Sequence, residues 1–210
     1  MLINEGMKSF IEKVDSLEPV PGGGSVSALV GVLGVSLGRM YQHLTFNKKS
    51  YLNKTPAEQT AFKAVFTELE VIKERLLILV DRDAAAYNTV LEAYRLPKND
   101  ETEIEKRNAA ILSATLLAID APLTIMKEAL AGLKLLEIIV GQGNKNAVSD
   151  VGVGAILLEG AVQGAFLNVK INLPQLAIAQ QESLLAEVNG LLEAAAQLKE
   201  RIMAQVNEEL

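Results

Sequence analysis

Asp83 is the first of two candidate residues for acid/base catalysis in this sequence. It shares one face of a predicted helix with Val80 and Tyr87, in an otherwise apolar pattern. A carboxylate on an apolar face costs several kcal/mol unless it is paired, and its pKa shifts. A shifted carboxyl group suits general acid/base catalysis. The alternative is a structural pair with Arg39, Arg82 or a tyrosine hydroxyl.

Asp150 is the second candidate, at the end of the polar segment GNKNAVSD. The segment precedes a predicted helix, where Asn, Ser and Asp are ordinary capping residues. Asn144, Asn146, Ser149 and Asp150 together are more than one cap requires. Asp150 also heads a helical line of small and apolar residues that continues through Gly154, so we expect its carboxyl group to face the interior.

Three glycines, Gly22, Gly23 and Gly24, lead through Ser25 into a predicted helix. Successive glycines let backbone N–H groups converge, and the helix N-terminus adds a partial positive charge. The motif predicts a site for a phosphate or a carboxylate, or else a flexible turn with Ser25 as the helix cap. It is not a P-loop, because the Gly-Lys-Ser/Thr ending is missing.

Two asparagines, Asn168 and Asn172, lie one helical turn apart in an otherwise apolar segment. Their amides could hydrogen-bond the polar edge of a heterocycle, or they could cap a helix end.

A solvated helix end is the simplest interpretation of His43, Lys48 and Lys49. The two lysines could instead bind an anionic tail.

The composition excludes several kinds of site. The chain has no Cys, which excludes disulfides, thiolate nucleophiles and Cys-ligated zinc. One histidine cannot build a multi-histidine metal centre, and no spacing predicts another metal site, so we expect none. The formal charge of −6 disfavours nucleic acid as a partner, because phosphates require a clustered basic surface.

We expect a cytoplasmic protein without membrane insertion. Charged residues occur too early in residues 1–14 for a signal peptide. The apolar stretch 26–37 is shorter than the roughly 20 residues that span a bilayer. The stretch 147–167 is long enough, but it contains Asp150 and Glu159.

The elements that must position these residues are helices. The chain is rich in Leu, Ala and Val and poor in aromatic residues, which is typical of packed helices. Apolar periodicity and caps predict helices over 4–16, 25–47, 55–95, 100–119, 122–140, 147–171 and 180–210. Pro122 either opens a new helix or kinks a continuous one. The prediction is an all-α, single-domain bundle of long antiparallel helices over residues 1–210.

Two of the predicted helices carry lines of tiny residues, which are Ser27, Gly31, Gly34 and Gly38 on one helix and Gly154, Ala161 and Gly164 on the other. Glycine in a helix interior costs about 1 kcal/mol relative to alanine, so these lines need a reason. Close packing of two helices is one reason. Room for a flat ligand against a helix wall is a second, compatible one.

Four stretches of the sequence, taken in order, resemble the cyclodeaminase family. This family comprises the C-terminal half of formiminotransferase-cyclodeaminase and its stand-alone bacterial relatives. The stretches are PGGGSVSALVGVLGVSLGRM, DAAAYNTVLEAYRLPK, APLTIMKEAL and GNKNAVSDVGVGAILLEGAVQGAFLNVKIN, within residues 4–173. The first and the last are specific, whereas the middle two are weak on their own.

The resemblance implies an all-helical homodimer that acts on tetrahydrofolate derivatives without a metal or redox cofactor. In the cyclodeaminase reaction, N10 of 5-formiminotetrahydrofolate attacks the formimino carbon and ammonia leaves, which gives the 5,10-methenyl cation. In the cyclohydrolase reaction, water adds to that same cation, and the lack of a formiminotransferase half keeps this option open. A non-catalytic helical dimer, with Asp83 and Asp150 paired and inaccessible, is the alternative outside the enzyme classes.

The resemblance also suggests roles for residues. We expect Asp83 and Asp150 to act as acid and base. Arg39, Lys48 or Lys98 would bind the glutamate carboxylate of the folate. The other expected substrate-binding residues are Gly22, Gly23, Gly24, Ser25, Asn144, Asn146, Ser149, Asn168 and Asn172.

Overall fold

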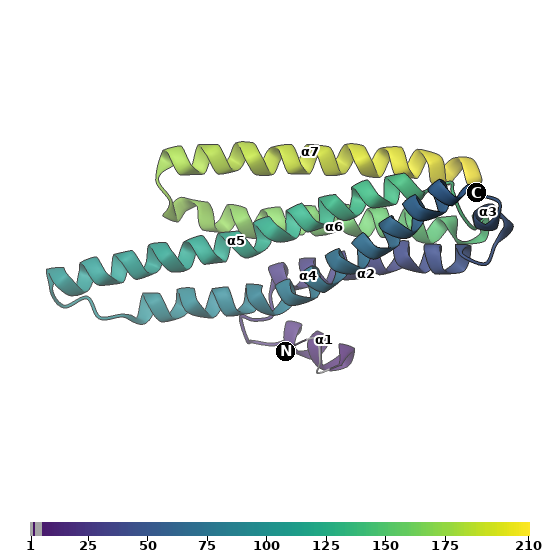
Figure 1. The fold of residues 1–210 in the computed structure, drawn as a ribbon. Coiled ribbons are helices and arrows are strands. Elements are labelled where there is room, and N and C mark those ends of the chain that lie inside the picture. Colours follow the sequence, from purple (N-terminus) through teal and green to yellow (C-terminus); the bar gives the residue numbers. More distant parts are fainter. Residues whose placement is uncertain (1, 3–5) are drawn as a thin grey trace.

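A computed structural model describes residues 2 and 6–210, and every regular element within them is a helix (Figure 1). The α-helices are α1 (Met7–Val14), α2 (Gly23–Thr45), α3 (Lys49–Leu52), α4 (Pro56–Arg95), α5 (Glu101–Ile139), α6 (Val148–Asn172) and α7 (Ile178–Glu209), and the 3₁₀ turns are η2 (Lys145–Ala147) and η3 (Leu173–Gln175). The predicted all-α class is confirmed.

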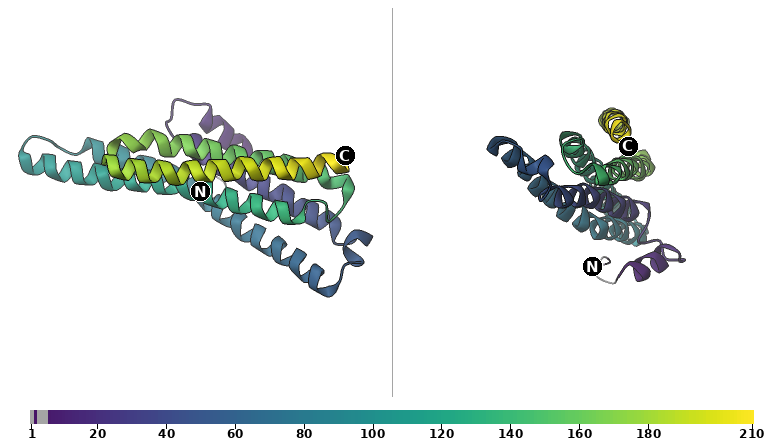
Figure 2. Two further views of the ribbon diagram at one scale, coloured as in Figure 1. Left: turned by 90° about the horizontal axis from the view of Figure 1, so that it is seen from above. Right: turned by 90° about the vertical axis from the view of Figure 1, so that its right-hand side faces the viewer.

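The long helices pack side by side as a bundle. α2 packs against α6 and α4, and α5 packs against α4 and α6. α7 covers α6 and α5, and α1 lies to the side of the long helices (Figures 1 and 2). α4 and α5 form an antiparallel pair whose connecting loop projects beyond the other helices at one end (Figure 1).

Capping residues set the starts of α4 and α5. The Thr55 side chain accepts from the Glu58 N–H, and the Glu58 side chain accepts from the Thr55 N–H, which forms a capping box for α4. Asp100 caps α5 by accepting from the N–H of Glu103. The prediction that Ser25 caps α2 is wrong, because the helix begins at Gly23 and Ser25 is buried in its first turn.

Other boundaries differ by a few residues. α1 begins at Met7 rather than residue 4, which lies outside the described residues. α2 ends at Thr45, and the short helix α3 and the turn η2 were not predicted. α7 begins at Ile178, two residues before the predicted start. The hydrophobic pattern thus locates each long helix but not its last turn.

Pro122 lies inside one continuous helix, α5, rather than between two helices. Because proline has no N–H, the carbonyl of Ala118, four residues earlier, lacks its usual helical donor. The buried side chains of Ile119 and Ile125 on either side of Pro122 hold this part of α5 in the core.

The lines of tiny residues serve close packing between helices. A Cβ on Gly34 would lie 2.9 Å from the Gly154 carbonyl oxygen, and a Cβ on Gly154 would lie 2.9 Å from the Gly34 carbonyl oxygen. A Cβ on Gly164 would collide with the Ser27 hydroxyl. α2 and α6 therefore touch backbone to backbone, and the lines themselves leave no room for a flat ligand.

Three segments are long and apolar enough, by length and composition, to cross a membrane. They are Gly23–Thr45, Glu101–Ile139 and Lys145–Gln175. The prediction that the first apolar stretch is too short is therefore wrong, because the helix continues beyond residues 26–37 on both sides. In their most apolar windows 50%, 44% and 44% of the residues are buried in the bundle. The absence of membrane insertion stays a prediction.

Candidate active site

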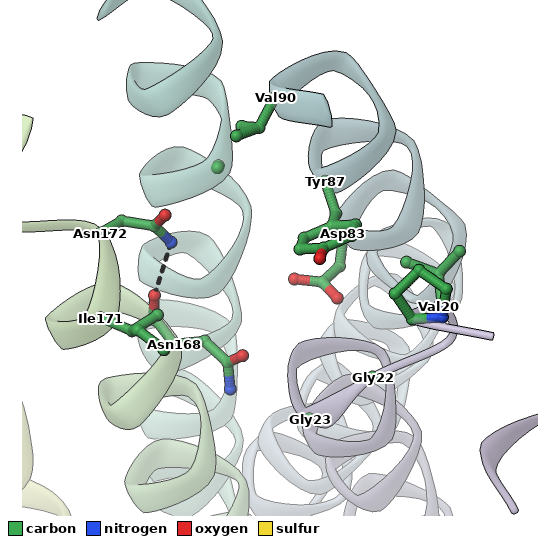
Figure 3. A pocket seen from close by; sticks show the side chains of 11 residues that line it. Val20, Gly22, Gly23, Asp83, Tyr87, Val90, Asn168, Ile171 and Asn172 are labelled. Carbon is green, nitrogen blue, oxygen red and sulfur yellow. Dashed lines mark hydrogen bonds between the residues drawn. The ribbon is translucent and has the colours of Figure 1, made fainter. Parts of the chain in front are cut away.

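A cavity of about 330 Å³ lies at the N-terminal end of α2, where α4, α5 and α6 meet (Figure 3). Its volume falls within the usual range for small-molecule sites. Its lining residues are Pro19, Val20, Gly22, Gly23, Asp83, Tyr87, Val90, Ala118, Asn168, Ile171 and Asn172. Five of these, Gly22, Gly23, Asp83, Asn168 and Asn172, were expected from the sequence to bind substrate or act on it.

Asp83 projects from α4 into this cavity, against the first turn of α2 (Figure 3). The Ser25 hydroxyl lies 2.8 Å from the Val80 carbonyl oxygen and 3.1 Å from Asp83 Oδ2, and its single hydrogen is shared between these two acceptors. The Ser25 N–H adds a backbone hydrogen bond to the same carboxyl group. Ser25, expected as a cap, instead holds Asp83.

Two opposing effects set the protonation of Asp83. Burial raises the pKa of the Asp83 carboxyl group, because it penalises the charged form, and the two hydrogen bonds from Ser25 lower it. Burial is the larger effect, so the pKa lies above its ordinary value. A carboxyl group shifted in this direction exchanges its proton closer to neutral pH, as general acid/base catalysis requires.

The glycine turn makes the close approach of Asp83 possible. A Cβ on Gly24 would overlap the carboxyl group of Asp83, so any larger residue would push the carboxyl group away. The helix N-terminus was expected to bind a phosphate or a carboxylate from a ligand. Instead the carboxylate that lies there is the chain's own Asp83.

Asn168 and Asn172 form the wall opposite Asp83 (Figure 3). The Asn168 side-chain N–H donates to the Gly164 carbonyl oxygen, and that of Asn172 donates to the Asn168 carbonyl oxygen, both at 2.9 Å. These bonds fix the two amides, and no hydrogen bond to either amide oxygen is found within residues 2 and 6–210. Two acceptor oxygens therefore remain for a ligand that carries N–H groups.

The remaining wall is aromatic and apolar. Tyr87 follows Asp83 by one helical turn and is 41% exposed, so its ring is accessible from the cavity. Its place on the apolar face of α4 was visible in the sequence, but its role as a lining residue was not predicted. Val90 and Ala118 complete this side. The only feature of the sequence that distinguishes Ala118 is its position four residues before Pro122.

The structure does not bring Asp150 to this cavity. Asp150 lies in the first turn of α6, and Asn168 lies near the end of the same helix. At 1.5 Å per residue they are about 27 Å apart along the axis. Asp83 and Asp150 therefore cannot act on one small ligand within a single copy of the chain, contrary to the expectation.

The Asn144 loop lies with Asp150 at the far end of the bundle. The Asn144 N–H donates to the Thr45 hydroxyl at 3.0 Å, and the Asn144 side-chain oxygen accepts from the Asn146 N–H at 3.2 Å. These contacts tie the loop to the C-terminal end of α2. Ser149 is exposed in the first turn of α6. None of the three lines the Asp83 cavity within one copy of the chain, so their role in binding substrate stays a prediction.

The basic residues expected to receive a carboxylate also lie elsewhere. Arg39 forms an ion pair with Glu70 at 2.8 Å and lies 3.8 Å from the centre of the Phe66 ring. Lys48 and Lys98 are exposed and line none of the cavities found. His43 is exposed at the last turn of α2, as its solvated-end interpretation predicts.

The chemistry of the cavity is that of a site for a cationic or N–H-rich heterocycle. It offers one carboxyl group and two amide oxygens, and no Lys or Arg is among its lining residues. No cluster of three His, Asp or Glu that could hold a metal ion occurs in the described part of the chain. The one group in the cavity with a shifted pKa is Asp83.

Comparison with known proteins identifies close relatives. The sequence model of the formiminotransferase-cyclodeaminase family matches residues 6–190. The chain is 34% identical to a methenyltetrahydrofolate cyclohydrolase of Methylorubrum extorquens, over 97% of this chain and 96% of that protein. It is 31% identical to formimidoyltransferase-cyclodeaminase of Gallus gallus, over 97% of this chain but only 37% of that longer protein.

A solved structure shares the fold. The structure of a formiminotetrahydrofolate cyclodeaminase from Thermotoga maritima superposes with a TM-score of 0.83, over 97% of this chain and 96% of that one. The sequences are 24% identical. The likeness therefore supports the arrangement of the helices rather than a reaction.

Burial of Asp83 predicts a pH-dependent effect of Asp83→Asn on stability. The raised pKa means that the folded state holds the proton more tightly than the unfolded state. The stabilisation of the neutral carboxyl group is fully present below the unfolded pKa of about 3.9, and it is lost as the pH rises through the folded pKa. We expect the free energy of unfolding of the variant, relative to the unsubstituted protein, to increase between pH 4 and pH 8. Urea denaturation at both pH values measures this, and a constant or falling difference would contradict the burial argument.

Proposed function

Because this chain belongs to the formiminotransferase-cyclodeaminase family, we propose that its Asp83 cavity binds a tetrahydrofolate derivative and that Asp83 transfers protons at the carbon bound to N5 and N10. The observation that carries the proposal is the half-buried Asp83 carboxyl group, with its raised pKa, facing two fixed amide oxygens across a cavity. Both the cyclodeaminase and the cyclohydrolase reaction fit this arrangement.

The cavity suits the reacting part of such a substrate. Formimino and methenyl groups on tetrahydrofolate carry positive charge, which a carboxylate stabilises in a partly buried site. The pterin ring carries N–H donors on one edge, and the amide oxygens of Asn168 and Asn172 are available as acceptors. The Tyr87 ring and the apolar wall suit a flat ring system.

In the cyclodeaminase reaction, one carboxyl group is enough to balance the protons. N10 attacks the protonated formimino carbon, and Asp83 accepts the proton that N10 releases. Asp83 then donates this proton to the amino group on the tetrahedral carbon. The carbon–nitrogen bond to that group breaks and ammonia leaves, which gives the 5,10-methenyl cation next to the Asp83 carboxylate. No metal or redox cofactor takes part in this scheme.

The cyclohydrolase reaction is the second candidate, favoured by the full-length relative that bears this name. Asp83 accepts a proton from the water that adds to the methenyl carbon. It returns the proton to N5 as the bond between that carbon and N5 breaks. The hydroxyl proton goes to solvent, and 10-formyltetrahydrofolate is the product. The same cavity and the same carboxyl group serve both reactions.

The non-catalytic alternative fits less well. It requires Asp83 to be paired and inaccessible, whereas Asp83 lines a cavity and has no cationic partner among the described residues. Arg82, one of the partners considered for Asp83, pairs with Asp120 at 2.6 Å instead.

We also propose that two copies associate through the outer faces of α2 and α6. These neighbouring helices leave large apolar side chains 39–64% exposed at helical spacing, namely Leu33, Met40 and Leu44 on α2 and Val153, Ile156 and Leu167 on α6. Large exposed apolar side chains on two neighbouring helices are typical of a surface that a partner covers. Ile171, which is 77% exposed, belongs both to this face of α6 and to the wall of the Asp83 cavity.

Replacing the proton-transfer group tests the proposed reaction. Asp83→Asn keeps the shape of the side chain but removes its proton chemistry. We expect kcat/KM to fall about 10²- to 10⁴-fold, with helical content unchanged by circular dichroism. The unsubstituted protein, Asp83→Asn and Asp150→Asn would each be offered 5-formimino- and 5,10-methenyltetrahydrofolate, and the methenyl absorbance would be followed.

The direction of the absorbance change separates the two reactions. A rise with the formimino substrate identifies the cyclodeaminase, and a fall with the methenyl substrate identifies the cyclohydrolase. Asp150→Asn removes an equal charge far from the cavity, so we expect it to keep most of the activity. Full activity of Asp83→Asn, or no activity of the unsubstituted protein with either substrate, would refute the proposal.

A charge on the apolar face tests the proposed dimer. We expect Ile156→Glu to halve the mass in solution, because an unpaired carboxylate cannot be buried between two copies without a large cost. Sedimentation velocity measures the mass. Ile78→Glu is the control, since Ile78 on α4 is exposed to a similar degree, 55% against 50%. A monomeric unsubstituted protein, or an unchanged mass for Ile156→Glu, would contradict the proposal.

A further inference from the structure

A further hollow lies beyond the Asp83 cavity along α4 and α5, nearer to the loop that connects these helices. This second hollow, of about 350 Å³, is lined by Tyr94, Arg107, Asn108, Ile111, Leu112 and Gln175. Tyr94 follows Val90 of the cavity by one turn of α4, and Gln175 follows Asn172 of the cavity by three residues. The same walls therefore border both hollows in the same order.

Arg107 is the cation of this second hollow. Its guanidinium group donates to the Tyr94 carbonyl oxygen from Nη2 at 3.2 Å and from Nε at 3.4 Å, and it lies 5.4 Å from the centre of the Tyr94 ring. Within residues 2 and 6–210, Arg107 has no carboxylate in an ion pair. Four other arginines each have one, namely Arg39, Arg75, Arg82 and Arg201. The positive charge of Arg107 is thus held in place but not neutralised.

The polar groups beside Arg107 are also hydrogen-bond donors. Asn108 and Gln175 carry amide N–H groups, and both line the hollow. A guanidinium group with two amides next to it matches the two oxygens of a carboxylate. This chemistry is complementary to that of the Asp83 cavity, where the polar groups are a carboxyl group and amide oxygens.

The spacing of the two sites matches an elongated ligand. Asp83 and Tyr94 are eleven residues apart on α4, which is about 16 Å along the axis. Between them lie the Tyr87 ring and Val90, which line the first hollow, and Ile111, which lines the second. Along α4 and α5 the order is therefore a carboxyl group, aromatic and apolar side chains, and a cation. A tetrahydrofolate has the complementary order of a reacting carbon, an aminobenzoyl ring and a glutamate.

We infer that Arg107, together with Asn108 and Gln175, binds the carboxylates of the glutamate tail of the substrate. The inference rests on the proposed function, because it assumes that the reacting carbon lies at Asp83. It moves the tail from Arg39 and Lys48 to the hollow near the α4–α5 loop, and it assigns the tail to Arg107 rather than to Lys98 within that loop. Arg107 acts as a binding residue there, and the reaction itself stays with Asp83.

Truncation of the ligand and of the side chain tests this subsite. Binding of 5-formyltetrahydrofolate and of 5-formyltetrahydropteroate, which lacks the glutamate, would be measured by calorimetry for the unsubstituted protein, Arg107→Ala, Arg107→Lys and Arg95→Ala. Turnover would be measured in parallel with the formimino and methenyl substrates. Arg95→Ala is the matched control, because it removes the same charge from the same end of the α4–α5 pair, and Arg95 lines neither hollow.

We expect Arg107→Ala to weaken binding of the glutamate-bearing ligand and to raise KM by about tenfold, as loss of one charge-assisted contact implies. We expect kcat and binding of the pteroate to be unchanged, Arg107→Lys to be intermediate, and Arg95→Ala to match the unsubstituted protein. Equal affinities of Arg107→Ala and the unsubstituted protein, or equal losses for both ligands, would overturn the subsite and leave the reaction standing.

The two proposals fail in different ways. If the unsubstituted protein turns over neither substrate but binds the glutamate-bearing ligand in an Arg107-dependent manner, the reaction is overturned and the subsite is supported. If it neither turns over nor binds these ligands, both proposals are overturned.

Discussion

The contact between the carboxyl group of Asp83 and the first turn of α2 is the interaction on which the rest of the site depends. Burial on α4 disfavours the charged carboxylate, whereas the hydroxyl and N–H of Ser25 favour it. Burial is the larger effect, so the pKa of the Asp83 carboxyl group lies above its ordinary value. The contact also explains the glycine at position 24, because any side chain there would displace the carboxyl group.

Close packing of α2 against α6 brings the opposite wall of the cavity to this carboxyl group. Because Gly34 and Gly154 let the two backbones touch, Gly23 at the start of α2 lies next to Asn168 near the end of α6. A Cβ on Gly23 would lie 3.2 Å from the Asn168 amide nitrogen. The tiny residues therefore fix the distance between the Asp83 carboxyl group and the amide groups on the opposite wall of the cavity.

Local patterns in the sequence predicted the helices and half of the site. Hydrophobic periodicity locates α4 and, as two segments separated at Pro122, α5, and Gly22, Asp83 and Asn168 do line one cavity. Asp150 does not reach this cavity within one copy of the chain, for a geometric reason. α6 has polar residues at both of its ends, and its 25 residues separate those ends by about 37 Å. No local sequence pattern shows which end of α6 faces Asp83, because this depends on the antiparallel packing of α2 and α6.

The Arg107 hollow was not predicted from the sequence, because its walls come from three elements, α4, α5 and η3, that only the folded chain brings together.

The pH dependence of kcat/KM in the unsubstituted protein and in Ser25→Ala tests whether Asp83, held by Ser25, is the proton-transfer group, because this profile reports the pKa of the catalytic group in the free enzyme. We expect the profile to show a pKa above the usual aspartate value of about 3.9. We also expect this pKa to be higher in Ser25→Ala, because a hydrogen bond that favours the carboxylate is lost. A pKa at the usual aspartate value, or one that Ser25→Ala leaves unchanged, would contradict the proposed role of Asp83.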